Sequence, residues 1–315
     1  MTKKILIIGG LGFIGKNLYL DLKAKGYKTV DIISTHEIQD TDIFAPMFLD
    51  KLYLGSIEDR EFLDEIIPHY DVIFSLAGIS GAATSFSKPY QDIDVNLKGH
   101  LNILEACCLS KNRIKIIFPS SRLVYGKPQY LPIDEKHPTK PESLYAIHKY
   151  TVEQYYLLYA QLHNINAIIL RISNPYGPYQ DSKMQNHGIL NNFIKKAVNQ
   201  EQIVIYGDGQ QRRDFFYIKD LTELMMTIAE TYSQNDIFNV GNTSNIALIH
   251  TIQILKEFIP NINYKHIEWP NIDKQIETGD YISNISKAKT ILGWEPRTDI
   301  RTGIKETIDY YKSIL

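Results

Sequence analysis

Ser121, Tyr145 and Lys149 are residue types that can exchange a proton with a substrate oxygen. Tyr145 and Lys149 stand four residues apart in an apolar helical stretch, so their side chains share one helix face. A nearby ammonium favours the phenolate, and we expect Lys149 to lower the Tyr145 pKa from its ordinary value of about 10. Ser121 follows an expected strand 24 residues earlier, where it could hydrogen-bond the same substrate oxygen. The trio predicts acid–base catalysis at a hydroxyl or carbonyl group.

The spacing of Tyr145 and Lys149 is a weak signal by itself, because the chain has 21 tyrosines and a packed aromatic beside a snorkelling lysine has the same spacing. A glycine-rich turn near the amino terminus supports the functional interpretation of the Tyr145–Lys149 spacing. An apolar stretch at 4–8 runs directly into Gly9, Gly12 and Gly15, where a helix is expected to begin. These glycines suit a tight turn, a close approach to a pyrophosphate, and close helix-on-strand packing, respectively. The turn predicts a dinucleotide site, and a P-loop is excluded because no Gly-Lys-Ser/Thr sequence follows.

Apolar runs alternate with helical stretches through the first half of the chain, which is typical of a parallel sheet covered on both faces. Strands are expected at 4–8, 28–33, 50–54, 71–76, 115–118 and 167–171, and helices at 13–25, 61–67, 95–108 and 144–163. We therefore predict an α/β fold with a Rossmann-type doubly wound parallel sheet in residues 1–173. Residues 174–315 are expected to form a smaller C-terminal α/β substrate lobe, with 215–217 and 237–240 returning to the first domain.

The composition excludes several functional classes. Because 34 Lys+Arg face 36 Asp+Glu, the net charge of −2 gives no general attraction to nucleic acid. No apolar run reaches the roughly 18 residues of a membrane span, and no signal peptide is recognisable, so we expect a cytoplasmic protein without membrane partners. Cys107 and Cys108 are too few for a cysteine zinc site, so we expect both to be buried apolar side chains and no metal to be bound.

The end of the second strand decides which dinucleotide binds, because an acidic side chain there would hold the adenosine ribose. Asp31 falls inside the expected strand rather than at its end. Ser34, together with Thr35 and His36, could instead donate hydrogen bonds to a 2′-phosphate. The cofactor is expected to be NAD or NADP, and these residues leave the choice open.

Taken in order along the chain, these motifs resemble those of the extended short-chain dehydrogenase/reductases. The similarity is specifically to the NAD-dependent epimerase/dehydratase group, which acts on nucleotide-diphosphate sugars, and it extends to Leu-Gly-Trp-Glu-Pro at 292–296. The resemblance implies that Ser121, Tyr145 and Lys149 are the catalytic residues. It also implies a cofactor site formed by Tyr145, Lys149 and residues of the glycine turn, the next strand ends and the following helix: Gly9, Gly12, Phe13, Ile14, Gly15, Ser34, Ser56, Ile57, Leu76, Ala77, Gly78 and Asn96.

The resemblance also implies a site for a nucleotide-diphosphate sugar. Asn174 matches the asparagine of the family's Arg-x-x-Asn-x-x-Gly stretch, which contacts the diphosphate region. Arg213 matches the arginine of Gly-x-Gly-x-x-x-Arg-Asp-Phe/Tyr, whose planar guanidinium can bind phosphate oxygens bidentately. With the serine pair Ser120 and Ser121, these are the residues we expect to contact the substrate.

Three positions depart from the family pattern. Ser56 replaces the aspartate that commonly holds the adenine amine, which weakens a simple NAD assignment. Arg122 and Leu123 replace the Asp-Glu pair of the dehydratase members, so 4,6-dehydration is disfavoured. Glu277 replaces an arginine that many members use as a second phosphate contact; Lys274 or another cation could substitute for it.

The remaining chemistry is oxidation or reduction at C4 of the sugar, and we expect a 4-epimerase. The alternative is an NADPH-dependent 4-keto-sugar reductase, because the missing ribose and adenine acids favour it. A dinucleotide-binding sensor without enzymatic activity is a third hypothesis, against which the intact trio argues. The resemblance implies a homodimer, formed through the tyrosine-rich helix at 144–163 and the helix at 95–108, although the tyrosine face could equally be core.

Overall fold

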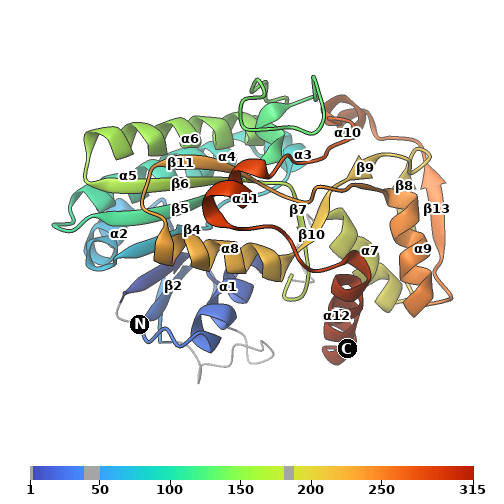
Figure 1. Cartoon of the computed structure of the whole chain (residues 1–315), viewed down its shortest axis with the longest axis horizontal. Coiled ribbons are helices and arrows are strands. Elements are labelled where there is room, and N and C mark those ends of the chain that lie inside the picture. The colour runs from blue at the N-terminus through green and yellow to red at the C-terminus, as the bar shows by residue number, and fades with distance from the viewer. Residues whose placement is uncertain (1–2, 39–49, 181–187) are drawn as a thin grey trace.

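The computed structural model describes residues 3–38, 50–180 and 188–315. Within them a seven-stranded parallel sheet has the order β11-β6-β5-β4-β1-β2-β3 (Figure 1). Its strands are β1 (Ile5–Ile8), β2 (Val30–Ser34), β3 (Lys51–Leu54), β4 (Val72–Ser75), β5 (Ile114–Ser121), β6 (Ile165–Ile172) and β11 (Asp236–Val240). The helical elements between them are α1 (Phe13–Ala24), α2 (Arg60–Ile66), η2 (Ile67–His69), α3 (Ala82–Ser87), α4 (Pro89–Ile93), η3 (Asp94–Gly99), α5 (His100–Cys108), η4 (Arg122–Tyr125) and α6 (Leu144–Leu162). The predicted Rossmann-type doubly wound sheet is confirmed.

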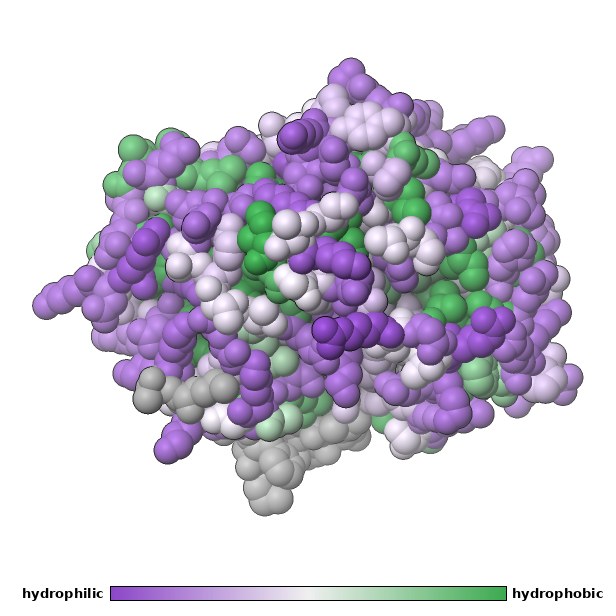
Figure 2. Space-filling view, viewed as in Figure 1, coloured by the Kyte–Doolittle hydropathy of each residue, from purple (hydrophilic) through white to green (hydrophobic). Residues whose placement is uncertain are grey.

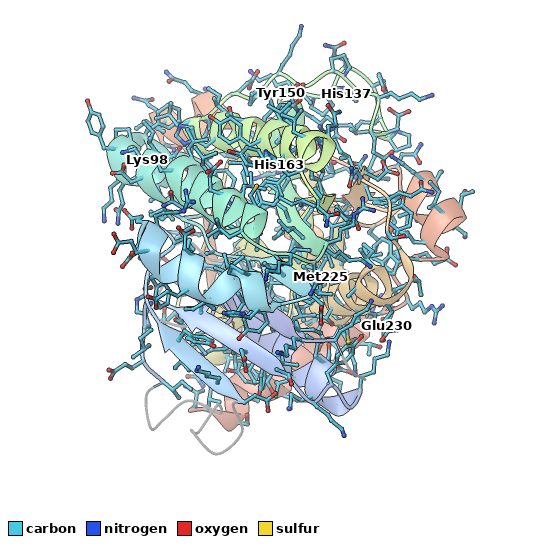
Figure 3. The ribbon with its side chains drawn as sticks, turned by 90° about the vertical axis from the view of Figure 1, so that its left-hand side faces the viewer. Lys98, His137, Tyr150, His163, Met225 and Glu230 are labelled. Carbon is cyan, nitrogen blue, oxygen red and sulfur yellow. The ribbon has the colours of Figure 1, made fainter. Side chains whose placement is uncertain are left out.

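Helices cover both faces of the sheet because its strands are apolar on both sides. In β1, Ile5 and Ile7 join the core cluster that contains α1, whereas Leu6 and Ile8 join the cluster beneath α2 and α5. All four residues are fully buried, as expected where a period of two faces apolar layers on both sides. The helix α8 (Ile218–Thr231), which carries Met225 and Glu230, packs beside α1, while α5 and α6 lie across the sheet (Figures 1 and 3).

The remaining elements build the smaller lobe at the carboxyl edge of the sheet. Two parallel pairs and one antiparallel pair of short strands form there: β7 (Asn174–Tyr176) with β10 (Phe215–Tyr217), β8 (Ile203–Tyr206) with β13 (Tyr264–Ile267), and β9 (Arg212–Arg213) with β12 (Ile246–Ala247). The helices are α7 (Ile189–Val198), α9 (Leu248–Phe258), α10 (Asn271–Ile276), α11 (Ser286–Leu292) and α12 (Ile300–Ser313). The chain returns from this lobe to the large sheet at β11, which lies beside β6.

Several expectations from the sequence need correction. Residues 215–217 do not rejoin the large sheet, because β10 pairs with β7. The helix expected at 95–108 contains a π-helical stretch, η3, before α5 begins. Cys107 is buried as expected, but Cys108 is exposed, because the two adjacent residues point to different sides of α5.

No helix in the described part of the chain is both long and apolar enough to cross a membrane. On the face shown in Figure 2, hydrophobic residues form separate groups among hydrophilic ones.

Candidate active site

The glycine-rich turn joins β1 to α1 and leaves room for phosphate groups. A Cβ on Gly15 would lie 2.6 Å from the Cα and carbonyl oxygen of Gly10, so helix and turn are in backbone contact. Gly12 is the N-cap of α1, and no side chain caps the helix start. The N–H groups of the first turn are therefore available to an anion, and the partly buried Phe13 and Ile14 flank them. These features fit the pyrophosphate of a dinucleotide.

Crowding at Gly15 leads to a first prediction. We expect Gly15→Ala to weaken NAD binding by about tenfold or more, because the new Cβ must push α1 away from the turn that holds the phosphates. Titration calorimetry would measure the affinity. Gly26→Ala is the matched control, because its φ of +87° brings backbone strain while no atom lies within 4 Å of the added Cβ. Equal NAD affinity in Gly15→Ala and the wild-type chain would contradict the prediction.

Among the described residues, no acid stands at the tip of β2, where the ribose is expected. Asp31 lies within β2, where its carboxylate accepts a hydrogen bond from Tyr70, and burial raises its pKa. Ser34 ends the strand, and its Oγ accepts from the His36 N–H at 3.1 Å. Ser56 donates to Glu58 at 3.0 Å, and the neighbouring Ile57 is buried, so both residues contact other parts of the chain. Their expected role in cofactor binding stays a prediction.

The three residues expected to be catalytic come together at the carboxyl edge of the sheet. Ser121 is the last residue of β5, and Tyr145 and Lys149 lie one turn apart near the start of α6. The side chain of Ser143 caps α6 by accepting from the Ala146 N–H at 3.2 Å, which fixes where the helix begins. Ser121 hydrogen-bonds Tyr145, and Lys149 Nζ lies 5.9 Å from the centroid of the Tyr145 ring. The arrangement places a phenol, a hydroxyl and an ammonium around one point.

Gly78 and Asn96 complete this centre from the neighbouring strand and helix. The Asn96 side chain accepts from the Ile79 N–H at 3.0 Å and donates to the Ile79 carbonyl at 2.9 Å. A Cβ on Gly78, whose φ is +157°, would lie 2.8 Å from Asn96 Oδ1 and 3.9 Å from Lys149 Nζ. The glycine in the Leu-Ala-Gly stretch is thus required by the close approach of Asn96, which the π-helical stretch η3 carries. Leu76 and Ala77, the other residues of that stretch, are partly buried.

The electrostatics of the trio differ from the expectation drawn from spacing. Burial raises the pKa of Tyr145 to about 12, although the hydrogen bond from Ser121 opposes that shift. Burial also lowers the pKa of Lys149 to about 8. The expectation that Lys149 lowers the Tyr145 pKa is therefore wrong for the chain alone, because burial is the largest influence on that pKa and the Asp92 carboxylate acts in the same direction. Lys149 Nζ instead donates to the Pro119 carbonyl at 3.1 Å and lies over the Phe118 ring.

These pKa values predict an acid limb in the rate. Below about pH 8 both Lys149 and Tyr145 carry their protons, so the pair offers no base to the C4 hydroxyl. One proton must leave before the phenolate–ammonium form exists, and we therefore expect kcat/KM to rise about tenfold per pH unit up to the Lys149 pKa and to level off above it. Lys149→Arg should move the plateau to higher pH, because a guanidinium keeps its proton and only the phenol can then titrate. A wild-type profile that is flat over about two pH units below the Lys149 pKa would contradict the assignment.

A buried network lies directly behind Ser121. The Ser120 hydroxyl donates to Glu153, whose carboxylate also accepts from Arg171 Nη2 at 2.7 Å and from Arg171 Nε at 3.0 Å. Glu153 is fully buried, and the Arg171 guanidinium lies 4.8 Å from the Tyr125 ring. Ser120 is thus engaged with the protein interior; that it also touches substrate stays a prediction.

Sequence reasoning missed a second pair of residues beside the trio. His148, which precedes Lys149 in α6, shares a short hydrogen bond with Asp92 of α4, and both side chains are buried. Oδ2 of Asp92 has no hydrogen-bond partner among the described residues. The Asp92 carboxylate raises the pKa of both Tyr145 and Lys149, although burial is the larger influence on each. A histidine inside the Tyr-x-x-x-Lys stretch was the available signal.

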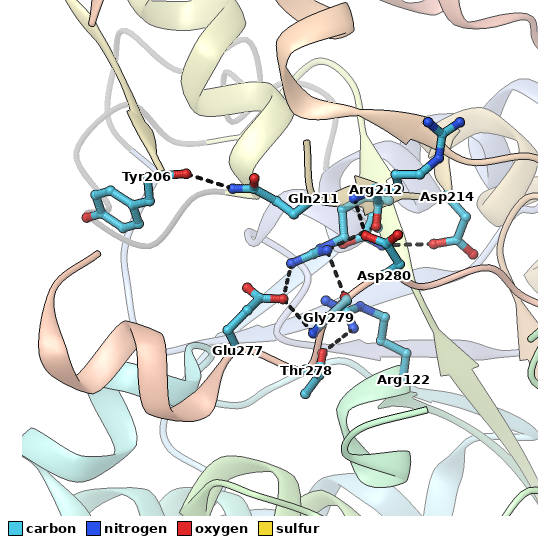
Figure 4. Close-up of polar contacts among 11 residues, drawn as sticks. Arg122, Tyr206, Gln211, Arg212, Asp214, Glu277, Thr278, Gly279 and Asp280 are labelled. Atoms are coloured by element: carbon cyan, nitrogen blue, oxygen red, sulfur yellow. Dashed lines mark hydrogen bonds and ion pairs between the residues drawn. The ribbon is translucent and has the colours of Figure 1, made fainter. Parts of the chain in front are cut away.

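The smaller lobe brings Arg213 together with Glu277 and Gly279, of which the last two are labelled in Figure 4. Arg213 Nη2 donates to Glu277 Oε1 at 2.6 Å, and Nη1 donates to the Gly279 carbonyl at 2.9 Å. Asn174 donates to Asp214 at 2.9 Å. Burial raises the pKa of Asp214 to about 6 against the hydrogen bonds from Ser283 and Asn174. Glu277 is therefore the ion-pair partner of Arg213 rather than a free carboxylate in the expected diphosphate region.

Comparison with known proteins agrees with this geometry. The model of the NAD dependent epimerase/dehydratase family matches residues 5–241. A Methanocaldococcus jannaschii protein provisionally named UDP-glucose 4-epimerase is 33% identical, over 98% of each chain. The chain belongs to the NAD-dependent epimerase/dehydratase family. The resemblance drawn from the motifs is confirmed.

Solved structures of epimerase/dehydratase family members have the same fold. UDP-glucose 4-epimerase from Thermotoga maritima, solved with UDP-glucose, superposes with a TM-score of 0.88 at 29% identity, covering 98% of this chain and 99% of that one. UDP-glucuronic acid 4-epimerase from Bacillus cereus, solved with UDP-glucuronic acid and NAD, gives 0.86 at 26% identity, covering 99% and 100%. The family is NAD-dependent, which favours NAD in the choice that the sequence left open.

Proposed function

We propose that this chain is a 4-epimerase that interconverts two nucleotide-diphosphate sugars differing in configuration at C4. The observation that carries the proposal is the grouping of Ser121, Tyr145 and Lys149 at the sheet edge that the glycine turn and the Arg213 lobe both face. Dinucleotide and sugar nucleotide would approach that point from opposite sides. The names of the similar 4-epimerases support the same reaction.

Three residues of the chain would transfer the C4 hydroxyl proton and orient the sugar. Tyr145 takes the proton from the C4 hydroxyl as that carbon is oxidised and returns it when the carbon is reduced on its other face. Ser121 holds the oxygen by a hydrogen bond, and the charge of Lys149 stabilises the phenolate. Bound NAD supplies the hydride acceptor and donor, so no cofactor is consumed over a cycle. Because the Tyr145 pKa is about 12 in the chain alone, one proton must leave the Tyr145–Lys149 pair before the phenolate can accept the C4 hydroxyl proton.

The substrate's nucleotide end would lie in the smaller lobe. Arg213 and Asn174 lie on strands that follow the catalytic elements, and Arg213 is the buried cation expected to meet the diphosphate. An open pocket beside them is lined by residues that include Lys127, Trp269, Lys274 and Glu277. That Lys274 and Glu277 line the same pocket supports Lys274 as the second phosphate contact.

Turnover of UDP-glucose by the purified protein tests the proposal. We expect formation of the C4 epimer, followed by proton NMR, with NAD present and no net change in NADH absorbance. Stoichiometric consumption of NADPH with a 4-keto sugar would instead identify a reductase, and release of carbon dioxide from a sugar acid would identify a decarboxylase. Dinucleotide binding without turnover of any sugar nucleotide would leave only the sensor hypothesis.

We also propose that the protein is a homodimer through α5 and α6. Leu101 of α5 and Leu158 of α6 are 37% and 49% exposed, and the two helices pack side by side. Tyr156 is fully buried, so the expected tyrosine face lies partly in the core. Light scattering should give about twice the chain mass of 36.3 kDa, and a value near one chain mass would exclude the dimer. Location in the cytoplasm stays a prediction.

A further inference from the structure

Arg122 is a buried cation that the proposed epimerase reaction does not use. It directly follows Ser121 and begins η4, and 9% of its surface is exposed. Its Nη1 donates to Thr278 Oγ1 at 3.0 Å, as Figure 4 shows, and its guanidinium lies 4.9 Å from the centroid of the Tyr281 ring. Arg122 therefore joins the catalytic edge of the sheet to the smaller lobe.

The acids around Arg122 are engaged with other groups. Glu277 pairs with Arg213, and Asp214 accepts hydrogen bonds from Ser283 and Asn174. Among the residues that the structure describes, no carboxylate lies within ion-pair distance of Arg122, and Thr278 accepts from one of its five N–H donors. Burial lowers the Arg122 pKa to about 10, and nearby Arg213 acts in the same direction. A largely buried guanidinium with donors left over binds an anion through charge-assisted hydrogen bonds that are stronger than those in water.

The position of Arg122 indicates which part of the substrate carries that anion. Its neighbour Ser121 contacts Tyr145, where the reacting oxygen would lie. Its partner Thr278 stands between Glu277 and Gly279, the two residues that the Arg213 guanidinium contacts. A substrate that spans from the catalytic hydroxyls to Arg213 would therefore pass Arg122 between its two ends. The portion between the reacting oxygen and the diphosphate is the sugar ring itself.

Building on the proposed 4-epimerase, we propose that Arg122 binds a carboxylate on the sugar ring, so that the preferred substrate is a nucleotide-diphosphate uronic acid. A planar guanidinium matches a carboxylate through two parallel N–H···O bonds, which an uncharged hydroxymethyl group cannot accept in the same way. Thr278 and the Tyr281 ring fix the guanidinium plane before the substrate arrives.

UDP-glucuronic acid and UDP-glucose are the two probes, because they share the nucleotide and the diphosphate and differ in the group on C5. We expect the wild-type chain to turn over UDP-glucuronic acid with at least about tenfold higher kcat/KM. Arg122→Gln should lower kcat/KM for UDP-glucuronic acid by about 10- to 150-fold, as loss of charge-assisted hydrogen bonds does, and change that for UDP-glucose by less than about threefold. Arg301→Gln, which removes an exposed arginine, is the control and should alter neither value.

The possible results with the two substrates separate failure of the uronic-acid assignment from failure of the proposed epimerase. Equal loss for both substrates in Arg122→Gln would place Arg122 on the shared diphosphate and overturn the uronic-acid assignment while leaving the epimerase intact. Absence of turnover with either substrate would overturn the epimerase and the assignment together. If Arg122→Gln fails to fold, as circular dichroism would show, calorimetry on the wild-type chain with NAD decides. Equal dissociation constants for the two sugar nucleotides would then refute the proposal.

Discussion

Replacing Tyr145 with phenylalanine is expected to lower kcat by about 10²- to 10⁴-fold, because the ring would remain and the hydroxyl that moves the proton would be gone. NAD affinity should change little, since the dinucleotide phosphates bind at the glycine turn rather than at the phenol.

Steady-state rates with UDP-glucose and UDP-glucuronic acid, together with calorimetric titration of NAD, would measure both quantities. Tyr155→Phe is the matched control, since it removes a hydroxyl from a partly buried tyrosine of the same helix outside the trio. Retention of the wild-type kcat in Tyr145→Phe would remove the phenol from the reaction. Loss of NAD binding would indicate a structural role instead.

The largest expected effect on stability comes from Glu153→Gln. Arg171 would keep its buried positive charge but lose its carboxylate partner, and breaking a buried pair in this way destabilises a protein by about 3–5 kcal/mol. Removing Glu153 also deprives the Ser120 hydroxyl of its acceptor, directly behind the catalytic Ser121. We therefore expect activity to fall together with stability.

Urea denaturation followed by circular dichroism would report the change in free energy of unfolding. The control is Glu257→Gln, because its pair with Arg301 is exposed on both sides and such pairs contribute about 0–1 kcal/mol. A similar small change for Glu153→Gln would show that Arg171 finds another partner or reaches water. Simultaneous removal in Glu153→Gln/Arg171→Met would then separate loss of the pair from burial of an unpaired charge.

The parts of the site that the sequence predicts correctly rest on local patterns. The glycine turn depends on one strand and one helix, and the common face of Tyr145 and Lys149 depends on helical spacing. Ser121 joins them because parallel strands end at the same edge of a sheet.

Other features depend on packing between distant segments, which no local pattern encodes. Arg213 and Glu277 are 64 residues apart, and Asp92 and His148 are 56 apart. The expected Tyr145 pKa is wrong for a related reason, because spacing gives the proximity of Lys149 but not the degree of burial. The separate pairing of β10 with β7 likewise depends on the smaller lobe, whose short strands carry weak signals.

The π-helical stretch at Asp94–Gly99 interrupts the regular α-helical winding and thereby positions the side-chain amide of Asn96. A π-helical turn holds more residues than an α-helical turn, so it is equivalent to an inserted residue within the continuous run from α4 to α5. Deleting one residue there would let the run wind uniformly and would rotate α4 by about 100° relative to α5. Asn96 would then move away from Ile79, and the backbone there would lose both of its hydrogen bonds to the Asn96 amide.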